Sequence, residues 1–308
     1  MKGKKKADKN WRSNNKVDNF AAPNSDKKVN MEKLTTVNSL RERLSGKRSG
    51  TIGFVPTMGA LHEGHLSLVR RARRENDTVV VSIFVNPTQF NDAADLRNYP
   101  RTPEADAELL ESAGADLVFM PSVEEVYPEP DTRTFDFGML DKVMEGATRP
   151  GHFNGVAQVV SRLFELVQPD KAYFGEKDFQ QIAIVKSMVE NLNFNVKIET
   201  CGIIREADGL ALSSRNRLLS EECRAAAPQI YAALQAGASS AGTKSIEEVC
   251  RDVVAGVERS GLLKVIYFSL VDEKTLLEVS DWSDAEHVRG CIAVQAGNVR
   301  LIDNMRFV

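Results

Sequence analysis

The chain from Met31 to about Ile204 alternates short runs of β-branched and apolar residues with longer segments of helical periodicity. We expect strands at Ile52–Val55, Val79–Val85, Leu117–Met120, Ala172–Phe174 and Val196–Ile204. Between the third and fourth of these, apolar residues from Val156 to Val167 recur three or four positions apart, which is one face of a helix. Strand–helix alternation predicts an α/β fold, a parallel sheet covered by helices on both faces. Ligands of such sheets bind beyond the carboxyl ends of the strands.

The pattern changes after Gly209. Helical segments are expected at Glu221–Gln235 and Ile246–Glu258, and strands at Val265–Val271, Cys291–Ala296 and Val299–Ile302, the last two forming a hairpin. The small residues at 236–242 are interpreted as a flexible loop. This part of the chain predicts a smaller α+β domain, so we divide the patterned sequence into domains at 31–204 and 205–308.

The first 30 residues have a different composition. They hold nine Lys and Arg against three Asp, with Asn and Ser abundant and almost no apolar periodicity. Such a segment cannot bury enough apolar surface to fold, so we predict a disordered basic extension at 1–30. A solvated tail and a tail that binds RNA or a membrane are both consistent with this composition, and Met31 could be the true start.

Charge and cysteine usage exclude several classes of partner. The formal net charge of -3 offers no general attraction to nucleic acid or to anionic membranes. No apolar run approaches the roughly 20 residues that a membrane span requires. The four cysteines are scattered without paired spacing, which is typical of idle thiols in a reducing compartment. With no targeting signal recognised, we predict a cytoplasmic protein.

Residues 56–65, Pro-Thr-Met-Gly-Ala-Leu-His-Glu-Gly-His, follow the first of these strands and open an amphipathic helix. A helix N-terminus presents unpaired N–H groups and a partial positive charge, which suit phosphate. Imidazoles at that turn can donate hydrogen bonds to phosphoryl oxygens. A zinc site is disfavoured because His62 and His65 are three apart, whereas the metalloprotease pattern needs four. Two unrelated surface histidines remain the plainer alternative.

Three further polar segments each follow a strand. Asn86 and Gln89 lie in Phe-Val-Asn-Pro-Thr-Gln-Phe-Asn, where the amides could bind a small polar substrate or simply be solvated. Gly-Glu-Lys-Asp-Phe-Gln-Gln at 175–181 supplies the cation of Lys177, and Asp178 is a candidate cap for the next helix. Ala-Leu-Ser-Ser-Arg-Asn-Arg at 211–217 could wrap a polyphosphate or be a capped helix start with exposed arginines.

Together with Gly-His-Phe-Asn-Gly-Val at 151–156, Arg-Glu-Ala-Asp-Gly at 205–209 and the terminal Arg-Leu-Ile-Asp-Asn at 300–304, these motifs closely resemble the pantoate–β-alanine ligase family. The likeness covers roughly residues 31–304. It implies a Rossmann-like domain of the nucleotidyltransferase type, a small C-terminal lid domain and a homodimer. It also implies ATP-dependent condensation of pantoate with β-alanine through a pantoyl-adenylate, releasing AMP and pyrophosphate, with Mg²⁺ as the cofactor.

The resemblance also implies roles for individual residues. His65, with His62 and Lys177, would be catalytic, and Gln89, Gln181 and Asn86 would hold pantoate and β-alanine. The ATP site would comprise Met58, Gly59, Ala60, Leu61, His62, Glu63, Gly64, His65, Gly175, Glu176, Lys177, Asp178, Ile204, Leu212, Ser213, Ser214 and Arg215. No protein ligand is assigned to the metal. Many family members have Met where this chain has Leu212, a departure that leaves the packing at this position open.

Three other functions compete with this interpretation. A relative that transfers AMP or CMP to a phosphorylated acceptor would favour Arg or Lys where this chain has Gln89 and Gln181. A tRNA-aminoacylating enzyme would need an anticodon-binding domain, for which about 100 C-terminal residues leave little room. A nucleotide sensor without catalysis would not require the pair of histidines and Lys177.

Overall fold

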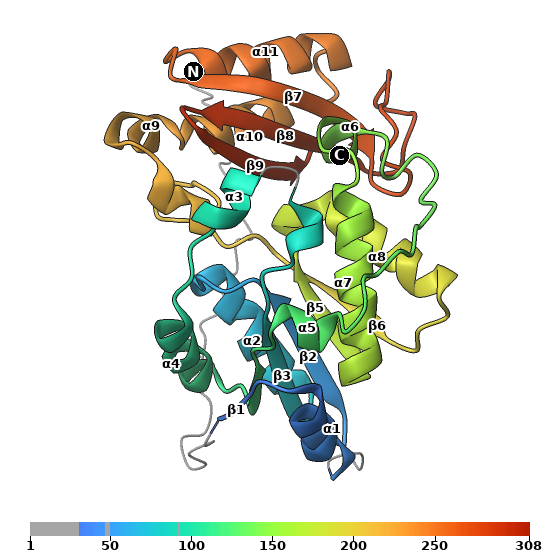
Figure 1. The fold of residues 1–308 in the computed structure, drawn as a ribbon. Coiled ribbons are helices and arrows are strands. Elements are labelled where there is room, and N and C mark those ends of the chain that lie inside the picture. Colours follow the sequence, from blue (N-terminus) through green and yellow to red (C-terminus); the bar gives the residue numbers. More distant parts are fainter. Residues whose placement is uncertain (1–30, 47–49, 91–92) are drawn as a thin grey trace, which may run out of the picture.

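The computed structural model describes residues 31–46, 50–90 and 93–308, so the predicted basic extension lies outside the described residues. Its larger sheet comprises Glu32–Leu34 (β1), Ile52–Thr57 (β2), Thr78–Ile83 (β3), Leu117–Phe119 (β4), Lys171–Gly175 (β5) and Lys197–Cys201 (β6). The strand order is β1-β4-β3-β2-β5-β6, and every neighbouring pair is parallel (Figure 1). The predicted α/β class with a parallel sheet is therefore confirmed.

The predicted strands agree with the observed ones in place, with two corrections. β1 was not expected, because Glu-Lys-Leu at the sheet edge has two charged residues and only one buried apolar residue, whereas the equally short β4 is the apolar run Leu-Val-Phe. The strand expected to reach Ile204 ends at Cys201, and residues 202–204 leave the sheet. These three residues instead form part of the cavity wall described below.

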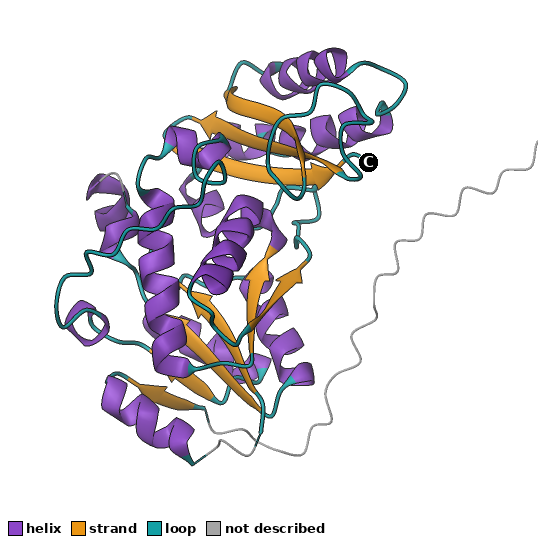
Figure 2. Ribbon diagram, turned by 90° about the vertical axis from the view of Figure 1, so that its right-hand side faces the viewer, coloured by secondary structure: helices purple, strands orange, loops and turns teal. Residues whose placement is uncertain are grey.

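Helices cover both faces of this sheet (Figure 2). The α-helices of this part of the chain are Val37–Ser45 (α1), Glu63–Glu75 (α2), Ala93–Asn98 (α3), Pro103–Ala113 (α4), Val123–Val126 (α5), Met144–Thr148 (α6), His152–Val167 (α7) and Phe179–Asn191 (α8). Helices α1, α7 and α8 share one apolar cluster with the sheet, and α2 and α4 share another. Successive residues of β2 separate accordingly, Phe54 entering the first cluster and Val55 the second, because side chains alternate along a strand.

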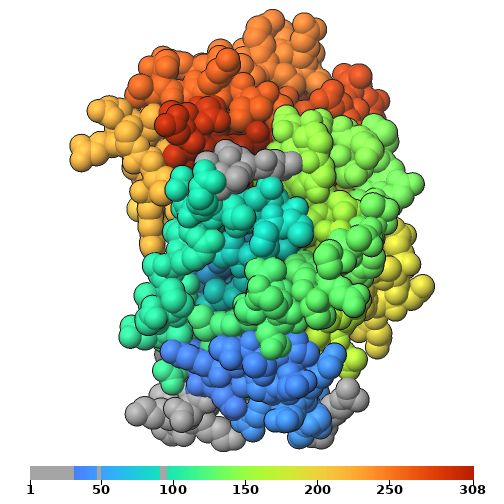
Figure 3. All heavy atoms as spheres, in the orientation of Figure 1, coloured from blue at the N-terminus to red at the C-terminus, as the bar shows by residue number. Residues whose placement is uncertain are grey.

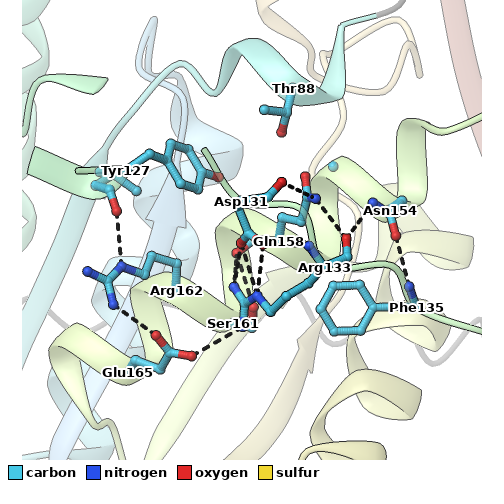
Figure 4. A network of polar contacts seen from close by, with 12 residues as sticks. Thr88, Tyr127, Asp131, Arg133, Phe135, Asn154, Gln158, Ser161, Arg162 and Glu165 are labelled. Carbon is cyan, nitrogen blue, oxygen red and sulfur yellow. Dashed lines mark hydrogen bonds and ion pairs between the residues drawn. The ribbon is translucent and has the colours of Figure 1, made fainter. Parts of the chain in front are cut away.

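Residues 131–135, in the segment that precedes α6, form hydrogen bonds and ion pairs with the outer face of helix α7 (Figure 4). The Gln158 side-chain amide donates to the carbonyls of Asp131 and Arg133, at 2.9 and 2.8 Å. Arg133 also forms ion pairs with Asp131 and with Glu165 of α7. Asn154, near the start of the helix, accepts from the Phe135 N–H at 2.9 Å. Helix α7, whose first turns border the candidate site, is thus held at several points along its length.

The C-terminal elements are Glu221–Ala226 (α9), Gln229–Ser239 (α10), Ile246–Glu258 (α11), Leu263–Asp272 (β7), Val288–Ala296 (β8) and Val299–Arg306 (β9). The three strands form an antiparallel sheet in the order β7-β8-β9, confirming the hairpin, with α10 and α11 packed on it. In Figure 1 these gold-to-red elements lie over the upper end of the larger sheet, and Figure 3 shows the same colours at the top of the molecule. The predicted domain division after Ile204 falls between β6 and this unit.

Two expectations in this unit were wrong. The helix expected at Glu221–Gln235 is interrupted before Gln229, since Pro228 supplies no N–H to continue the first helix. The expected loop at 236–242 is helical as far as Ser239. Gly237 is small for packing: a Cβ there would lie 2.5 Å from a Val253 methyl carbon on α11.

The four cysteines are free, as the sequence predicted. Within the described residues, every helix is too short or too polar to cross a bilayer.

Candidate active site

A cavity of about 220 Å³ opens at the carboxyl ends of β2, β5 and β6. The strand ends contribute Thr57, Gly175 and Gly202, and the loop before η3 (Ser214–Leu218) closes another side. Of the sequence-predicted residues, the cavity is lined by Met58, His62, Gly64, His65, Gln89, Gly175, Lys177, Asp178, Gln181, Ile204, Leu212, Ser213, Ser214 and Arg215. Segments as far apart in sequence as Met58 and Arg215 therefore meet at one rim of the sheet, where parallel sheets bind ligands.

Six predicted residues do not line this cavity: Gly59, Ala60, Leu61, Glu63, Asn86 and Glu176. Glu63 is exposed and pairs with Arg70. Asn86 is fully buried, where it caps the 3-10 turn Pro87–Gln89 (η1) and donates to the Gly155 carbonyl at 3.1 Å. The structure therefore gives Asn86 a supporting position behind the cavity wall.

The two histidines cap the start of α2. The Nδ1 atom of His62 accepts a hydrogen bond from the Gly64 N–H at 3.2 Å, and Nδ1 of His65 accepts from the His62 N–H at 3.4 Å. This reciprocal pattern is a capping box, which explains the three-residue spacing of the imidazoles. Because each Nδ1 is an acceptor, each neutral ring carries its proton on Nε2. Both residues thus retain an Nε2–H donor.

The surroundings of the two rings keep them neutral. Burial lowers the pKa of His62 to about 4, with the charges of Lys177 and Arg217 acting in the same direction. Burial, His62 and Lys177 lower the pKa of His65 to about 3. The ring centroids are 4.1 Å apart, so two imidazolium ions would repel each other strongly. At neutral pH the free protein therefore presents two uncharged hydrogen-bond donors to the cavity.

The turn before these histidines depends on a residue that the sequence did not single out. Gly59 and Ala60 both have positive φ, at 83° and 50°, and the second is costly for a residue with a Cβ. The buried carboxylate of Asp106 accepts from the N–H groups of Ala60 and Leu61, at 2.9 and 2.8 Å. A single acidic residue near the start of α4 gives no sequence signal for this role. Its function appears only once α4 packs beside α2.

Gln89 ends the turn η1, and this turn is held by the start of α7. The His152 Nδ1 atom lies 2.8 Å from the Gln89 carbonyl oxygen, and Arg149 Nη1 lies 3.1 Å from His152 Nε2. A guanidinium only donates, so Nε2 of His152 accepts and Nδ1–H donates to Gln89. The Gly-His-Phe-Asn-Gly-Val motif thereby acquires a structural role: it fixes the backbone from which the Gln89 amide reaches the cavity.

Gly155 on α7 is expected to tolerate no larger residue. A Cβ there would lie 2.5 Å from the Thr88 carbonyl oxygen, which is backbone and cannot rotate away. We expect Gly155→Ala to lower the free energy of unfolding by about 1–3 kcal/mol, as measured by urea denaturation. Gly46→Ala is the matched control, because its Cβ would meet nothing within 4 Å. Equal stability of Gly155→Ala and the wild type would contradict this account.

His152 is expected to make stability depend on pH. Burial, with the nearby Arg149 charge, lowers its pKa from 6.5 to about 4. Between these two values the unfolded chain binds the extra proton, so stability is retained above pH 6.5 and falls as the pH is lowered. From pH 7 to pH 5 the wild type should lose about 2 kcal/mol more than His152→Gln, in urea unfolding at both pH values. Identical losses in the two proteins would refute this role.

Lys177 lies in the single 3-10 turn Glu176–Asp178 (η2) that follows β5. Its side chain is 20% exposed, and its ammonium lies 3.5 Å from Asp178 Oδ1. The neighbouring Glu176 carboxylate points away from the cavity and pairs with Arg289 of β8 at 2.9 Å. Asp178 makes no side-chain capping bond to α8, contrary to the sequence expectation. The turn thus presents one cation to the cavity, and that cation depresses the pKa values of both histidines.

The loop carrying Leu212 to Arg215 closes the cavity opposite the strand ends. Ser213 caps η3 by accepting from the Arg215 N–H at 3.3 Å, and both residues also line the cavity. The Leu212 N–H donates to the Ile204 carbonyl at 3.0 Å, so these two wall segments are tied together. The Arg215 guanidinium lies 5.9 Å from the centre of the Tyr99 ring. Hydroxyl and guanidinium donors are thus gathered beside the histidines.

Sequence reasoning also missed the apolar wall of the cavity. It is formed mainly by Val156, Val159, Val160 and Leu163 of α7, with Phe84 beside them. Helical periodicity predicted that these residues form the apolar face of a helix that packs on the core. Their spacing does not show which residues of that face line a cavity and which pack against other side chains. Among the described residues, no group of three or more His, Cys, Asp or Glu side chains is arranged to hold a metal ion.

Known proteins match this chain over most of its length. A family model described as pantoate-beta-alanine ligase matches residues 32–306. The pantothenate synthetase of Porphyromonas gingivalis is 57% identical over 279 residues, covering 90% of this chain and 99% of that protein. The crystal structure of pantothenate synthetase from Thermus thermophilus is 49% identical with a TM-score of 0.85, covering 90% of this chain and 99% of that one. A Francisella tularensis pantoate-beta-alanine ligase, solved with beta-gamma ATP and beta-alanine, is 35% identical with a TM-score of 0.76, at 90% and 98% coverage.

Proposed function

Because the chain belongs to the pantoate-beta-alanine ligase family, and so joins pantoate to β-alanine to form pantothenate, we propose that it does so through a pantoyl-adenylate. Family membership removes the competing phosphate-acceptor, tRNA and sensor interpretations. The observation that carries the proposal is the meeting of His62, His65 and Lys177 around one cavity that also holds Gln89 and Gln181.

The proposed chemistry has two steps. A pantoate carboxylate oxygen attacks the α-phosphorus of ATP, an O–P bond forms, and the bond to pyrophosphate breaks. The amine of β-alanine then attacks the acyl carbon, a C–N bond forms, the C–O bond to AMP breaks, and the amine loses a proton. Neither step needs a covalent bond to the protein, so catalysis rests on alignment and on stabilising negative charge.

The charge-stabilising roles follow from the side chains present. The Nε2–H groups of His62 and His65 would donate to phosphate oxygens, His65 being the catalytic donor. Lys177 and Arg215 supply positive charge, and the Ser213 and Ser214 hydroxyls supply further donors. The backbone of Met58, Gly64, Gly175, Ile204 and Leu212 would shape the remainder of the ATP site. Five of the predicted ATP-site residues do not line the cavity: Gly59, Ala60, Leu61, Glu63 and Glu176. They would act by fixing the conformation of the turn before α2 and of the turn η2.

Pantoate combines a carboxylate and hydroxyls with two methyl groups on one carbon. The amides of Gln89 and Gln181 would bind its polar groups, and Gln89 would also contact β-alanine. The apolar wall of α7 would receive the methyl groups. Asn86 would contribute by fixing the turn that carries Gln89, through its bonds to Thr88 and Gly155.

We propose that Mg²⁺ enters with ATP and is held mainly by phosphate oxygens and water. Asp178 is the only carboxylate on the cavity wall among the described residues, and it is 46% exposed, so it is the side chain able to complete this coordination. The ion would supply positive charge at the phosphates. We also propose a cytoplasmic homodimer, and light scattering on the purified protein tests the oligomeric state.

The adenylate can be tested with oxygen-18 in the carboxylate of pantoate. We expect pyrophosphate release from pantoate and Mg-ATP without β-alanine, and one labelled oxygen in AMP after β-alanine is added. Unlabelled AMP, or pyrophosphate release only when β-alanine is present, would contradict the two-step proposal.

A further inference from the structure

The terminal motif Arg300 to Asn304 lies on β9, the edge strand of the small sheet, and its polar side chains contact segments outside that sheet. Arg300 pairs with Glu145 of α6 and contacts Thr148 at 2.8 Å. Asp303 forms two hydrogen bonds with Arg205, at 2.6 and 3.0 Å. Arg205 directly follows Ile204 of the cavity wall. The strand thus contacts separate segments that surround the site.

Asn304 makes the most specific of these contacts. Its side chain is buried, and its Nδ2 atom donates to the carbonyl oxygens of Glu176 and Lys177, at 2.9 and 3.0 Å. Its Oδ1 atom accepts from Arg289 Nη1 at 2.6 Å. Both amide hydrogens and the carbonyl oxygen of Asn304 therefore have partners. Only an amide combines two donors with one acceptor in this arrangement.

Arg289 strengthens the same attachment. It lies on β8, is 5% exposed, and binds the Glu176 carboxylate as well as Asn304. The small domain therefore holds Glu176 by its side chain and by its backbone. The guanidinium also lies 4.3 Å from the centre of the Phe179 ring, at the start of α8. The turn that carries Lys177 is thus held on the side away from the cavity.

This support matters because η2 is a single turn of three residues. A 3-10 turn of this length has few i→i+3 hydrogen bonds, and their geometry is poorer than in an α-helix, so contacts from outside are needed to fix its backbone. The lysine side chain has four rotatable bonds, so the position of its ammonium depends on a fixed backbone. The two bonds from Asn304 supply that fixation at the lysine itself.

We propose that Asn304 is a positioning residue for Lys177, so that docking of the small domain is a condition for fast attack on ATP. The proposal rests on the proposed role of Lys177 in adenylate formation. It assigns the end of the chain a part in catalysis without contact to substrate: the amide of Asn304 holds two consecutive carbonyls, and the lysine between them is thereby aimed at the cavity.

The test is a double-mutant cycle between Asn304→Asp and Lys177→Met. Aspartate has nearly the same shape as asparagine but places oxygen against both carbonyls. We expect Asn304→Asp to slow single-turnover pyrophosphate release about tenfold or more, and to have no further effect once Lys177 is Met. A merely structural role would slow both backgrounds equally. Equal slowing in both backgrounds, or a wild-type rate in Asn304→Asp, would overturn the proposal.

Ser269→Ala provides the matched control for lost stability. Ser269 is buried on β7 and donates to Glu278 at 2.7 Å, a hydrogen bond confined to the small domain. We expect the Ser269→Ala variant to have a lower melting temperature than the wild type but the same rate of pyrophosphate release. A slow Ser269→Ala would mean that general loosening of the domain explains the effect, and would overturn the specific role of Asn304.

Two further measures keep the test decisive. If Asn304→Asp does not fold, Asn304→Ser takes its place in the cycle, because the hydroxyl supplies one donor in place of two. If the wild type releases no pyrophosphate without β-alanine, the adenylate proposal has failed, and the same cycle is then read on pantothenate formation. Non-additivity in that readout would support the positioning role by itself, and additivity would overturn it.

Discussion

Replacing Lys177 by methionine is expected to slow pyrophosphate release from ATP and pantoate about a hundredfold, with little change in the overall fold. The Lys177 side chain is 20% exposed and lies on the cavity wall with both histidines, so its charge acts where solvent screens less than at the open surface. Loss of one such charge-stabilising group in a preorganised site costs about 3 kcal/mol of transition-state stabilisation, which is near a hundredfold in rate. Single-turnover assays at saturating Mg-ATP measure the change directly.

Two controls make this prediction specific. Lys142→Met removes an exposed lysine that pairs with Asp141 outside the cavity, and should leave the rate unchanged. Because the Lys177 charge lowers the pKa values of His62 and His65, Lys177→Met should also raise both values, as measured by NMR titration of the imidazoles. A Lys177→Met enzyme with normal turnover would end the assignment of Lys177 as a catalytic group.

The sequence predicted those elements of the fold that are determined by residues close together in the chain. Alternation of apolar strands and amphipathic helices revealed five of the six strands of the parallel sheet, because each contains a run of apolar or β-branched residues. The polar edge strand β1, Glu-Lys-Leu, does not. The helix break before Gln229 follows from Pro228, which local reasoning can detect, whereas the helical state of Ala236 to Ser239 depends on packing. From the sequence alone, Gly237 indicates a loop. In the fold, the same glycine allows α10 to pack closely against α11.

The candidate site divides in the same way. Residues that follow directly on strands, such as His62, Gln89 and Lys177, could be found because parallel strands end at one edge of the sheet. Residues that hold those groups could not, because their partners are remote. Asp106 reaches Ala60 across 46 positions, and Asn304 reaches Glu176 across 128. Such supporting contacts have no local pattern, so only the packed structure reveals them.

The second large effect is expected at His65, where two substitutions separate its two hydrogen bonds. Asparagine keeps an acceptor near the position of Nδ1, which receives the His62 N–H, but has no group at Nε2. Glutamine is longer and places an amide N–H near Nε2. We therefore expect His65→Asn to slow pyrophosphate release about a hundredfold, and His65→Gln to recover at least tenfold of that loss.

The comparison depends on the neutral state of the ring. With a pKa near 3 in the free protein, His65 donates as an uncharged imidazole at neutral pH, so an uncharged amide is an adequate substitute. If His65 acted as a cation, neither variant would replace it and both should be equally slow. Single-turnover rates measured at pH 7.5 distinguish the two cases, and melting temperatures report how far each variant loses the α2 cap. Equal rates for His65→Asn and His65→Gln would therefore refute the role of the Nε2–H donor.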